Sequence, residues 1–416
     1  MEDRILDQDQ SERNQCTYSK GTVPGEQGGN SGVKGVCTMR RNGLKLLAIL
    51  VSVILMIVSG AASSEELVEM DENFFVSADP AYEKLVDRVK KTSHGNSFTG
   101  SILLATENGV ILYGGPKAMT TEGRPIDMHT TYDIGSCSKT FTAVAVFQLI
   151  DAGLVSLEDP LSKFFPEYET GRDITVYQLL HMQSGIADYT NDPETFWGDV
   201  CKKNPDKFMY MFFHDELTDE DFLQALYAAP LDYTPGTESY YSNTNYHLLA
   251  MIVEKASGKK FNEYLQEHIL VPCGMEHTTS MVIGDETSVP THFKDLLSAG
   301  VVNENGYSPQ PNTERGAGGI HTCVADLWAF DRALLSGQLV NSGSLKEMMH
   351  FDMDYGCGLY PYGKHAYGHS GRNGTYTTEN VIIESEQYGR VFFIVSTSTD
   401  AGTYGLDALL KLISWI

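Results

Sequence analysis

The sequence lacks the motifs that typically bind metals or carry out redox chemistry. No C-x-x-C and no H-E-x-x-H occurs, and the seven cysteines are scattered over 416 residues without metal-ligand spacing. His365 and His369 are four residues apart, but their glycine- and tyrosine-rich surroundings do not predict a helix that would align them. We therefore expect no metal and no cofactor. We expect Cys137, Cys273 and Cys323 to be small buried side chains, with a role as disulfide partners as the second possibility.

Basic residues are also scarce. The chain contains 30 lysines and arginines against 55 acidic residues, which gives a net charge of −25. This balance argues against nucleic acid and against anionic membrane surfaces as partners. A solvated acidic surface explains the charge most simply, and a preference for cationic substrates is the alternative.

Long apolar runs are rare, and the one that stands out lies near the N-terminus. Residues 1–38 are polar and without periodicity, so we predict a disordered lead. A basic stretch from Met39, the apolar run Leu46–Val58 and small residues after it are typical of a secretory signal. The alternative is a membrane anchor, since Leu46–Ala62 reaches the lower limit of a transmembrane helix. We favour a cleaved signal over 39–64 and an exported protein, with membrane contact only if this segment is retained.

The remaining chain has strand patterns at both ends and helical patterns between them. We predict, in order, an amphipathic helix Asp79–Lys91 capped by Asp79, a hairpin of Phe98–Leu104 and Val110–Tyr113, mostly helices to about residue 315, a second hairpin of Asn380–Glu384 and Arg390–Ser396, and a helix Leu406–Ile416.

This order predicts a mixed α/β protein of the α+β type. One antiparallel sheet is completed by strands from both chain ends and flanked by helices, and a large helical lobe is inserted between them. We assign one domain to about 75–416, with a sheet lobe at about 75–139 and 316–416 and a helical lobe at about 140–315. The boundary between the lobes is the natural place for a site.

The first candidate motif is Ser136 with Lys139. Their side chains share one face of the first helical turn, because they are three residues apart. A serine hydroxyl needs a base to take its proton, and a lysine is such a base only where a desolvated or cationic site lowers its pKa. The helix N-terminus favours the negative charge that develops on the serine oxygen. S-x-x-K alone is common by chance, so its meaning depends on the rest of the chain.

The second candidate motif is Tyr241 with Asn243, just before a helix predicted over His247–Ala256. A tyrosine hydroxyl can accept or relay a proton if nearby cations lower its pKa. An asparagine two residues later offers a donor and an acceptor that orient a substrate amide. Taken alone, tyrosines before a helix also occur where they only pack or cap.

The third candidate motif is centred on His369. Neighbouring glycines, including Gly371, permit close backbone approach at the edge of a sheet. The histidine could hydrogen-bond or protonate a catalytic neighbour. The alternative is a glycine-rich surface loop with an incidental histidine.

Together, Ser136–Lys139, Tyr241–Asn243 and His369–Gly371 resemble, in this order and spacing, the serine β-lactamase and penicillin-binding-protein superfamily. The resemblance is greatest to its class C-like branch, which includes D-Ala-D-Ala carboxypeptidases, D-amino-acid amidases and family VIII esterases. Three motifs in register are far more specific than one. The resemblance covers about residues 80–416, and two further stretches, 179–185 and 316–322, look like the same branch.

The resemblance implies roles for these residues. Ser136 matches the acylated nucleophile and Lys139 the base that activates it. Tyr241 matches the tyrosine that shares protons with the lysine, and Asn243 the residue that holds the acyl-side amide of the substrate. His369 stands where many relatives have the lysine of K-T-G, which favours a D-specific peptidase or amidase over a dedicated β-lactamase.

The segment after His369 completes the implied site. Ser370, Gly371 and Arg372 match substrate-binding positions, and the backbone N–H groups of Ser136 and Arg372 match the oxyanion hole. The Arg372 side chain could meet a substrate carboxylate. We see no glutamate in a deacylation motif of the class A kind, so water activation would fall to Tyr241 and Lys139.

The implied function is a serine hydrolase that works through an acyl-enzyme on a small molecule or peptide. A D-amino-acid-containing peptide, amide or cell-wall stem peptide is the first choice. An esterase, an acyltransferase or a class C-like β-lactamase on the same site is the alternative. A penicillin-binding sensor that is acylated but does not turn over is an alternative of another class.

Overall fold

The computed structural model describes residues 67–71, 74–95, 98, 100–115, 126–198, 218–280, 314–373, 376–397 and 410–416. They belong to one structural unit, Ala62–Ile416. The disordered lead and the signal segment predicted over 1–38 and 39–64 lie outside these residues. Within them, we find no helix whose length and apolar character would let it cross a membrane.

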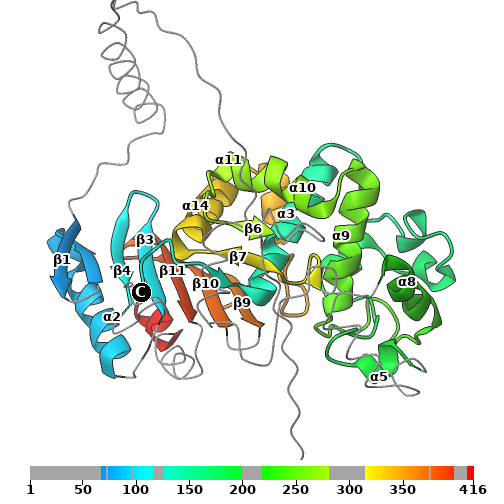
Figure 1. Cartoon of the computed structure of the whole chain (residues 1–416), viewed down its shortest axis with the longest axis horizontal. Coiled ribbons are helices and arrows are strands. Elements are labelled where there is room, and N and C mark those ends of the chain that lie inside the picture. The colour runs from blue at the N-terminus through cyan, green and yellow to red at the C-terminus, as the bar shows by residue number, and fades with distance from the viewer. Residues whose placement is uncertain are drawn as a thin grey trace, which may run out of the picture. The chain divides into compact units, whose positions relative to one another are not determined.

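Strands from both ends of the chain form one antiparallel sheet of eight strands. The order is β1-β2-β4-β3-β11-β10-β9-β8. The strands are β1 (Leu67–Asp71), β2 (Phe74–Ser77), β3 (Ser101–Thr106), β4 (Val110–Gly114), β8 (Tyr360–Pro361), β9 (Ala366–Asn373), β10 (Tyr376–Ser385) and β11 (Gly389–Thr397). The early strand β3 pairs with the last strand β11, from Ser101↔Ser396 to Thr106↔Val391 (Figure 1). The predicted α+β fold, with its sheet built from both chain ends, is confirmed.

Both faces of this sheet are covered, which explains its continuous apolar runs. Alternate residues of β3 point to opposite faces, as strand geometry requires. Leu103 and Ala105 join a core with Phe141 and Phe330, whereas Leu104 joins a second core on the other face. This second core also holds the apolar face of helix α2 (Glu83–Gly95) and Leu412 from the end of the chain.

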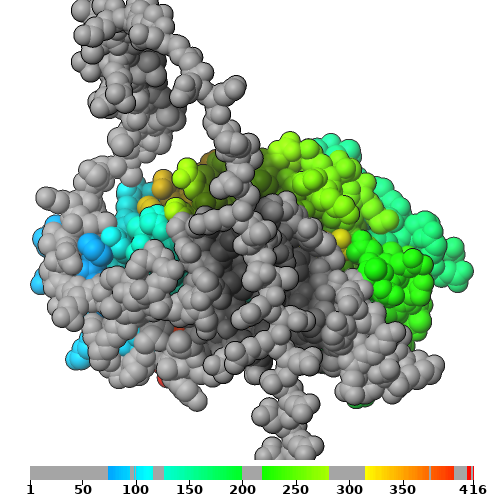
Figure 2. Space-filling view, viewed as in Figure 1, coloured from blue at the N-terminus to red at the C-terminus, as the bar shows by residue number. Residues whose placement is uncertain are grey.

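The described residues in the middle of the chain, 138–198 and 218–280, are mostly helical, as predicted for this part. Its helices and turns are α3 (Ser138–Asp151), η3 (Leu161–Lys163), η4 (Glu169–Arg172), α4 (Val176–Leu180), α5 (Pro193–Phe196), α8 (Asp219–Ala228), α9 (Asn243–Ser257), α10 (Phe261–Leu265), η5 (Gln266–Leu270) and α11 (Val271–Cys273). In the space-filling view the green segments extend from the top centre to the right, whereas the blue N-terminal strands lie at the left (Figure 2). The exact lobe boundaries stay a prediction.

The central helix α3 packs against α9 and is buried almost all round. A short second sheet of order β5-β7-β6 lies beside α3 and consists of β5 (Tyr132–Asp133), β7 (Ile320–Thr322) and β6 (Thr279–Ser280). β5 leads directly into the turn η2 (Gly135–Cys137) that carries Ser136.

The other predicted elements are found with small differences. Asp79 caps the turn η1 (Pro80–Tyr82) that precedes α2. The predicted C-terminal helix is described only over its end, as the 3₁₀ turn η6 (Lys411–Trp415). Two further helices, α14 (Val324–Leu335) and α15 (Ser342–Met348), follow β7. The four described cysteines, Cys137, Cys273, Cys323 and Cys357, are free thiols.

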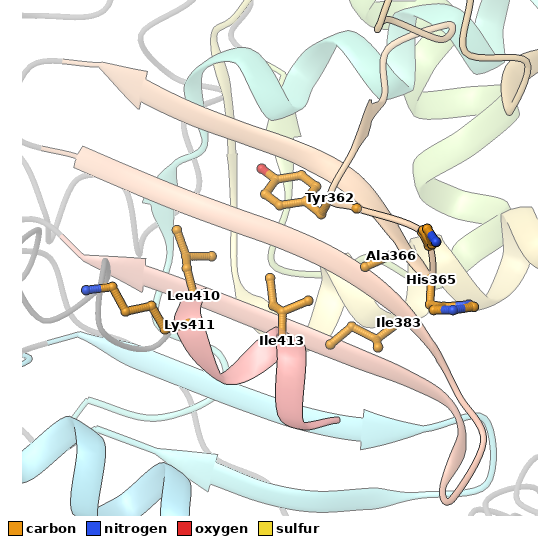
Figure 3. Close-up of a pocket in the computed structure, with 9 residues that line it drawn as sticks. Tyr362, His365, Ala366, Ile383, Leu410, Lys411 and Ile413 are labelled. Carbon is orange, nitrogen blue, oxygen red and sulfur yellow. The ribbon is translucent and has the colours of Figure 1, made fainter.

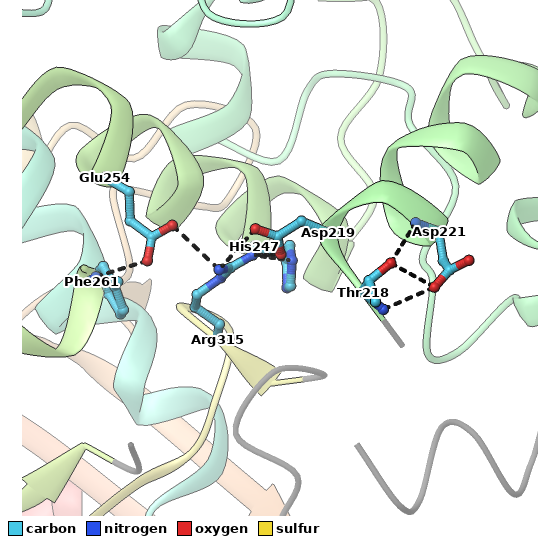
Figure 4. A network of polar contacts seen from close by, with 7 residues as sticks. All are labelled: Thr218, Asp219, Asp221, His247, Glu254, Phe261 and Arg315. Atoms are coloured by element: carbon cyan, nitrogen blue, oxygen red, sulfur yellow. Dashed lines mark hydrogen bonds and ion pairs between the residues drawn. The ribbon is translucent and has the colours of Figure 1, made fainter. Parts of the chain in front are cut away.

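A buried arginine holds the helical lobe together. The Arg315 guanidinium donates to the carboxylates of Asp219 at the start of α8 and Glu254 in α9, and it lies 3.2 Å from Nε2 of His247 (Figure 4). Because its side chain is only 8% exposed, these partners compensate the cost of burying its charge.

A groove of about 500 Å³ lies at the C-terminal end of the chain. It is lined by the segment Tyr362–Ala366, by Ile383 of β10 and by the C-terminal residues Leu410, Lys411 and Ile413 (Figure 3). None of its lining residues belongs to the three motifs, so this groove is not part of the site described next.

Candidate active site

Ser136 lies in a tight turn that its neighbours fix. The backbone N–H of Gly135 donates to Asp133 Oδ1 at 2.8 Å, and Gly135 has a positive φ of 47°. A Cβ atom at Gly135 would lie only 2.7 Å from the backbone nitrogen of Arg372. Glycine therefore lets β9 approach the turn closely, and the Ser136 side chain stays partly exposed.

Lys139 is completely buried one helical turn after Ser136. Its Nζ lies 3.0 Å from Ser136 Oγ and 2.7 Å from both Asn243 Oδ1 and the Ala317 carbonyl oxygen. Burial lowers the pKa of Lys139 to about 7, although the carboxylates of Asp188 and Glu314 oppose this shift. A neutral amine has two N–H bonds and one lone pair. Since the carbonyl oxygens of Asn243 and Ala317 can only accept, they take the two N–H bonds and leave the lone pair for Ser136.

Tyr241 completes the contacts of Ser136. Its hydroxyl donates to Ser136 Oγ at 2.6 Å. Burial raises the pKa of Tyr241 well above its usual value, so the condition that cations lower it is not met. At neutral pH Tyr241 is a phenol, a proton donor and relay rather than a base.

Asn243 is the first residue of α9 and points at the lysine. Its Oδ1 accepts from Lys139, while its Nδ2 donates to Thr190 Oγ1 at 2.7 Å and to Asp188 Oδ2 at 3.1 Å. All of these polar contacts lie within the protein. The Asn243 side chain therefore positions Lys139. To hold a substrate amide, as the resemblance implies, it would have to exchange one of these contacts for a contact with the substrate.

His369 lies on β9 and is 2% exposed. Its Nδ1 is 2.5 Å from the Ser370 carbonyl oxygen, which can only accept, so Nδ1 carries the proton. Its Nε2 therefore accepts from the hydroxyl of Tyr355 at 3.0 Å. Burial, together with the charge of Lys139, lowers the pKa of His369 to about 3. Among the described residues, no hydrogen bond joins this neutral imidazole to Ser136, Lys139 or Tyr241.

The segment after His369 runs along the serine turn. A Cβ atom on Gly371 would collide with the carbonyl of Ile134 and lie 3.0 Å from the backbone nitrogen of Ser136. The backbone of Arg372 contacts Gly135 in the same way. The two predicted oxyanion donors, the N–H groups of Ser136 and Arg372, thus belong to adjoining segments. Ser370 is half-buried, and the Arg372 side chain is exposed.

Sequence reasoning missed an aromatic wall beside the serine. The ring of Tyr355 lies 4.6 Å from that of Tyr360, and Tyr360 lies 5.0 Å from the ring of His369. Tyr241 packs 6.3 Å from Tyr355 and 6.4 Å from Tyr360. No motif marks these tyrosines, although the run Tyr355–Tyr362 is rich in aromatic residues and glycines.

A second missed feature is a pair of buried carboxyl groups bridged by Asn373. Asn373 Nδ2 lies 2.6 Å from Asp133 Oδ2 and 3.0 Å from Glu314 Oε1. Burial and the nearby charge of Asp133 raise the pKa of Glu314 to about 8. The bridge links the segments before Ser136 and after Arg372, so it fixes the oxyanion donors relative to each other.

Comparison with known proteins agrees with this geometry. The family model described as Beta-lactamase matches residues 85–412. PbpX of Bacillus subtilis (strain 168), whose name assigns it to the penicillin-binding proteins, is 24% identical over 321 residues, which are 75% of this chain and 74% of that protein.

Two solved structures show the same fold. The D-amino acid amidase from Ochrobactrum anthropi SV3 has a TM-score of 0.62 at 20% identity and covers 80% of this chain and 100% of its own. A penicillin-binding protein from Bacillus halodurans has a TM-score of 0.61 at 22% identity and covers 78% and 99%. Because the family match extends over most of the chain and includes all three motifs, this protein is a serine hydrolase of the β-lactamase and penicillin-binding-protein superfamily.

Proposed function

We propose that this protein is an exported hydrolase that cleaves D-amino-acid-containing peptides or amides through an acyl-Ser136 intermediate. The observation that carries the proposal is the pair of contacts at Ser136 Oγ. A lysine with a pKa of about 7 lies 3.0 Å away, and a phenol donates from 2.6 Å.

Acylation begins with proton transfer from Ser136 to the lone pair of neutral Lys139. Each of the three protons of the ammonium that forms has an acceptor. Asn243 Oδ1 and the Ala317 carbonyl take two of them, and Ser136 Oγ accepts the third. Ser136 Oγ then attacks the substrate carbonyl. The N–H groups of Ser136 and Arg372 hold the developing oxyanion, and each such donor typically lowers the barrier by about 3 kcal/mol.

Collapse of the tetrahedral intermediate needs a proton on the leaving group. Tyr241 is the donor, since burial keeps it a phenol and its hydroxyl points at the reacting oxygen. The Lys139 ammonium, whose Nζ lies 4.8 Å from the centre of the Tyr241 ring, then returns its proton to the Tyr241 phenolate, so that both groups regain their starting protonation state. Deacylation by water runs in reverse, with neutral Lys139 and Tyr241 moving the protons.

The preference for D-amino-acid substrates is supported by the neighbours and by the third motif. The amidase and penicillin-binding proteins named above share the fold. In this chain His369 is neutral, so it supplies no charge for a substrate carboxylate. The exposed Arg372 is the cation that this segment offers for a free C-terminus.

Matched substrates test this proposal. We expect hydrolysis of D-amino-acid amides and of peptides ending in D-Ala-D-Ala, and at least about tenfold slower hydrolysis of the L-isomers. Arg372→Ala should raise KM for the free peptide acid but leave KM for the corresponding amide unchanged. Equal rates for both isomers, or hydrolysis of small esters alone, would contradict the D-specific assignment and favour an esterase.

Export is the part of the proposal that rests on sequence alone. The basic, apolar and small-residue pattern over 39–64 supports it. N-terminal sequencing of the mature protein should find cleavage near residue 64, whereas an intact N-terminus in the membrane fraction would favour an anchor.

A further inference from the structure

Three chain segments far apart in sequence meet at the small second sheet. β7 pairs with both β5 and β6, which brings the loop before β5 and the start of β6 close to the end of β7. His129, His277 and Cys323 lie on these three segments, one on each. One ligand atom of each side chain lies within 4.8 Å of the other two. The two imidazole rings are 4.5 Å apart.

The cluster is accessible and is not part of the catalytic machinery. His129 is exposed, the His277 side chain is 28% exposed, and Cys323 is buried beneath them. Within the described part of the chain, no hydrogen bond or ion pair joins any of the three to Ser136, Lys139 or Tyr241. An ion could therefore enter from solvent without displacing a catalytic side chain.

The carboxylate of Asp326 lies beside both the backbone and the ring of His277. Its Oδ2 accepts from the backbone N–H of His277 at 2.8 Å and from the Thr278 hydroxyl at 2.7 Å. Its Oδ1 lies 3.7 Å from Nδ1 of the His277 ring. The negative charge of this carboxylate favours a proton on Nδ1, in which case Nε2 would be the ring atom that binds a metal. Such carboxylate–histidine pairs typically accompany metal-bound histidines.

The donor set selects the kind of ion. Two imidazole nitrogens and a thiolate suit Zn²⁺ and similar transition metals, whereas Ca²⁺ and Mg²⁺ require oxygen ligands. Neighbouring ligands in a tetrahedral zinc site are about 3.3–3.8 Å apart, given Zn–N and Zn–S bonds of about 2.1 and 2.3 Å. Since the three ligand atoms lie within 4.8 Å of one another, they would have to close in by at most about 1.5 Å. The exposed His129 is the member of the cluster with the fewest packing constraints.

We propose that His129, His277 and Cys323 bind one Zn²⁺ ion, with water as the fourth ligand and Asp326 orienting His277. The ion links the loop that leads through β5 to Ser136 with β6 and β7, so it stabilises the sheet beside the catalytic turn. The spacing of cysteines and histidines along the chain predicted no metal, because these ligands come together only in the folded sheet. This inference does not depend on the proposed substrate.

A second cluster, formed by His181, Glu347 and His350, is less suited to an ion. Both ring nitrogens of His181 already contact backbone carbonyls, those of Tyr177 at 3.1 Å and of His350 at 3.2 Å. A bound ion would have to displace one of these contacts. His350 is exposed and serves as a control for incidental binding by a surface histidine.

Titration of the full-length, metal-free protein with Zn²⁺, followed by calorimetry, tests the proposal. We expect one ion that binds at least about tenfold more weakly to Cys323→Ser and to His129→Ala. Serine keeps the helix cap that Cys323 provides to α14, and His129 is exposed, so both variants should fold. Cys273→Ser and His350→Ala should bind as the wild type does.

Co²⁺ gives a readout independent of activity. The wild type should show the intense visible bands of tetrahedral Co²⁺ and a thiolate-to-cobalt charge-transfer band, and Cys323→Ser should lack the latter. Saturating Zn²⁺ should raise the thermal midpoint of the wild type by a few degrees, but not that of Cys323→Ser. Absence of binding to the wild type, equal binding by Cys323→Ser and wild type, or a spectrum without the thiolate band would overturn the site.

Discussion

Replacing Lys139 by methionine removes the proton acceptor of Ser136 while keeping a side chain of similar length and shape. The substitution leaves Asn243 Oδ1 and the Ala317 carbonyl without their donor, which costs about 1–3 kcal/mol for each buried acceptor. Comparison of the thermal midpoints of the variant and the wild type shows whether the variant is folded at the assay temperature. The loss of a positioned general base typically slows a reaction by about 10²–10⁴-fold, or about 3–5 kcal/mol in the barrier.

In the wild type, the rate of acylation should depend on the protonation state of Lys139 and therefore on pH. Only the neutral amine accepts the serine proton, and the pKa of Lys139 is about 7. About half of the enzyme is then competent at pH 7 and about 1% at pH 5, so acylation should slow about a hundredfold between pH 8 and pH 5. The curve of acylation rate against pH must therefore have a limb that rises with pH, because the deprotonated form of Lys139 is the active one.

The rate of labelling by a fluorophosphonate measures both effects without a known substrate. Lys139→Met should label at least about 10²-fold more slowly than the wild type at pH 8 and should lose the rising limb. Lys163→Met, at an exposed lysine, is the matched control and should keep both the rate and the limb. A flat profile between pH 5 and 8 in the wild type, or a folded Lys139→Met that labels normally, would refute lysine as the base.

Three further substitutions test other parts of the structure. Gly371→Ala should slow labelling by the fluorophosphonate about 10²-fold or more, because the new methyl group collides with the Ile134 carbonyl and displaces an oxyanion donor. An unchanged labelling rate would show that β9 does not hold the oxyanion. Arg315→Ala should lower the free energy of unfolding, measured in urea, by about 3 kcal/mol, since it leaves Glu254 without its buried partner. A loss of stability below about 1 kcal/mol would contradict the role of this ion pair. Asp331→Asn should stabilise the protein by about 1–3 kcal/mol more at pH 8 than at pH 5. Burial raises the pKa of Asp331 from 3.8 to about 8, so the stability of the wild type falls as pH rises through this window, and a pH-independent difference would argue against it.

The sheet and the motifs could be predicted from the sequence because both are encoded locally. The continuous apolar runs Ile102–Ala105 and Val391–Val395 are typical of strands that are buried on both faces. Because hairpin patterns occur at both ends of the chain, a sheet completed from both ends could be predicted, whereas the pairing of β3 with β11 is known only from the structure. Ser136, Lys139, Tyr241 and Asn243 meet in the structure as their motifs predicted.

What the sequence did not predict depends on contacts between distant segments. The partner of His369 is Tyr355, which no motif identifies, and the imidazole is neutral because the folded protein buries it beside Lys139. Burial also reversed the expected direction of the Tyr241 pKa. Likewise, the bridge from Asp133 through Asn373 to Glu314 joins residues that have no common pattern.

The most direct test of the central claim is the intact mass of the full-length protein after reaction with a fluorophosphonate, with Ser136→Ala in parallel. The account predicts one covalent adduct, located by peptide mapping on Ser136 and absent from the variant. A parallel reaction with a penicillin would then separate a penicillin-binding peptidase, which forms a penicilloyl adduct on Ser136, from an esterase or amidase, which forms none. An unmodified wild type, or equal labelling of Ser136→Ala, would contradict Ser136 as the nucleophile.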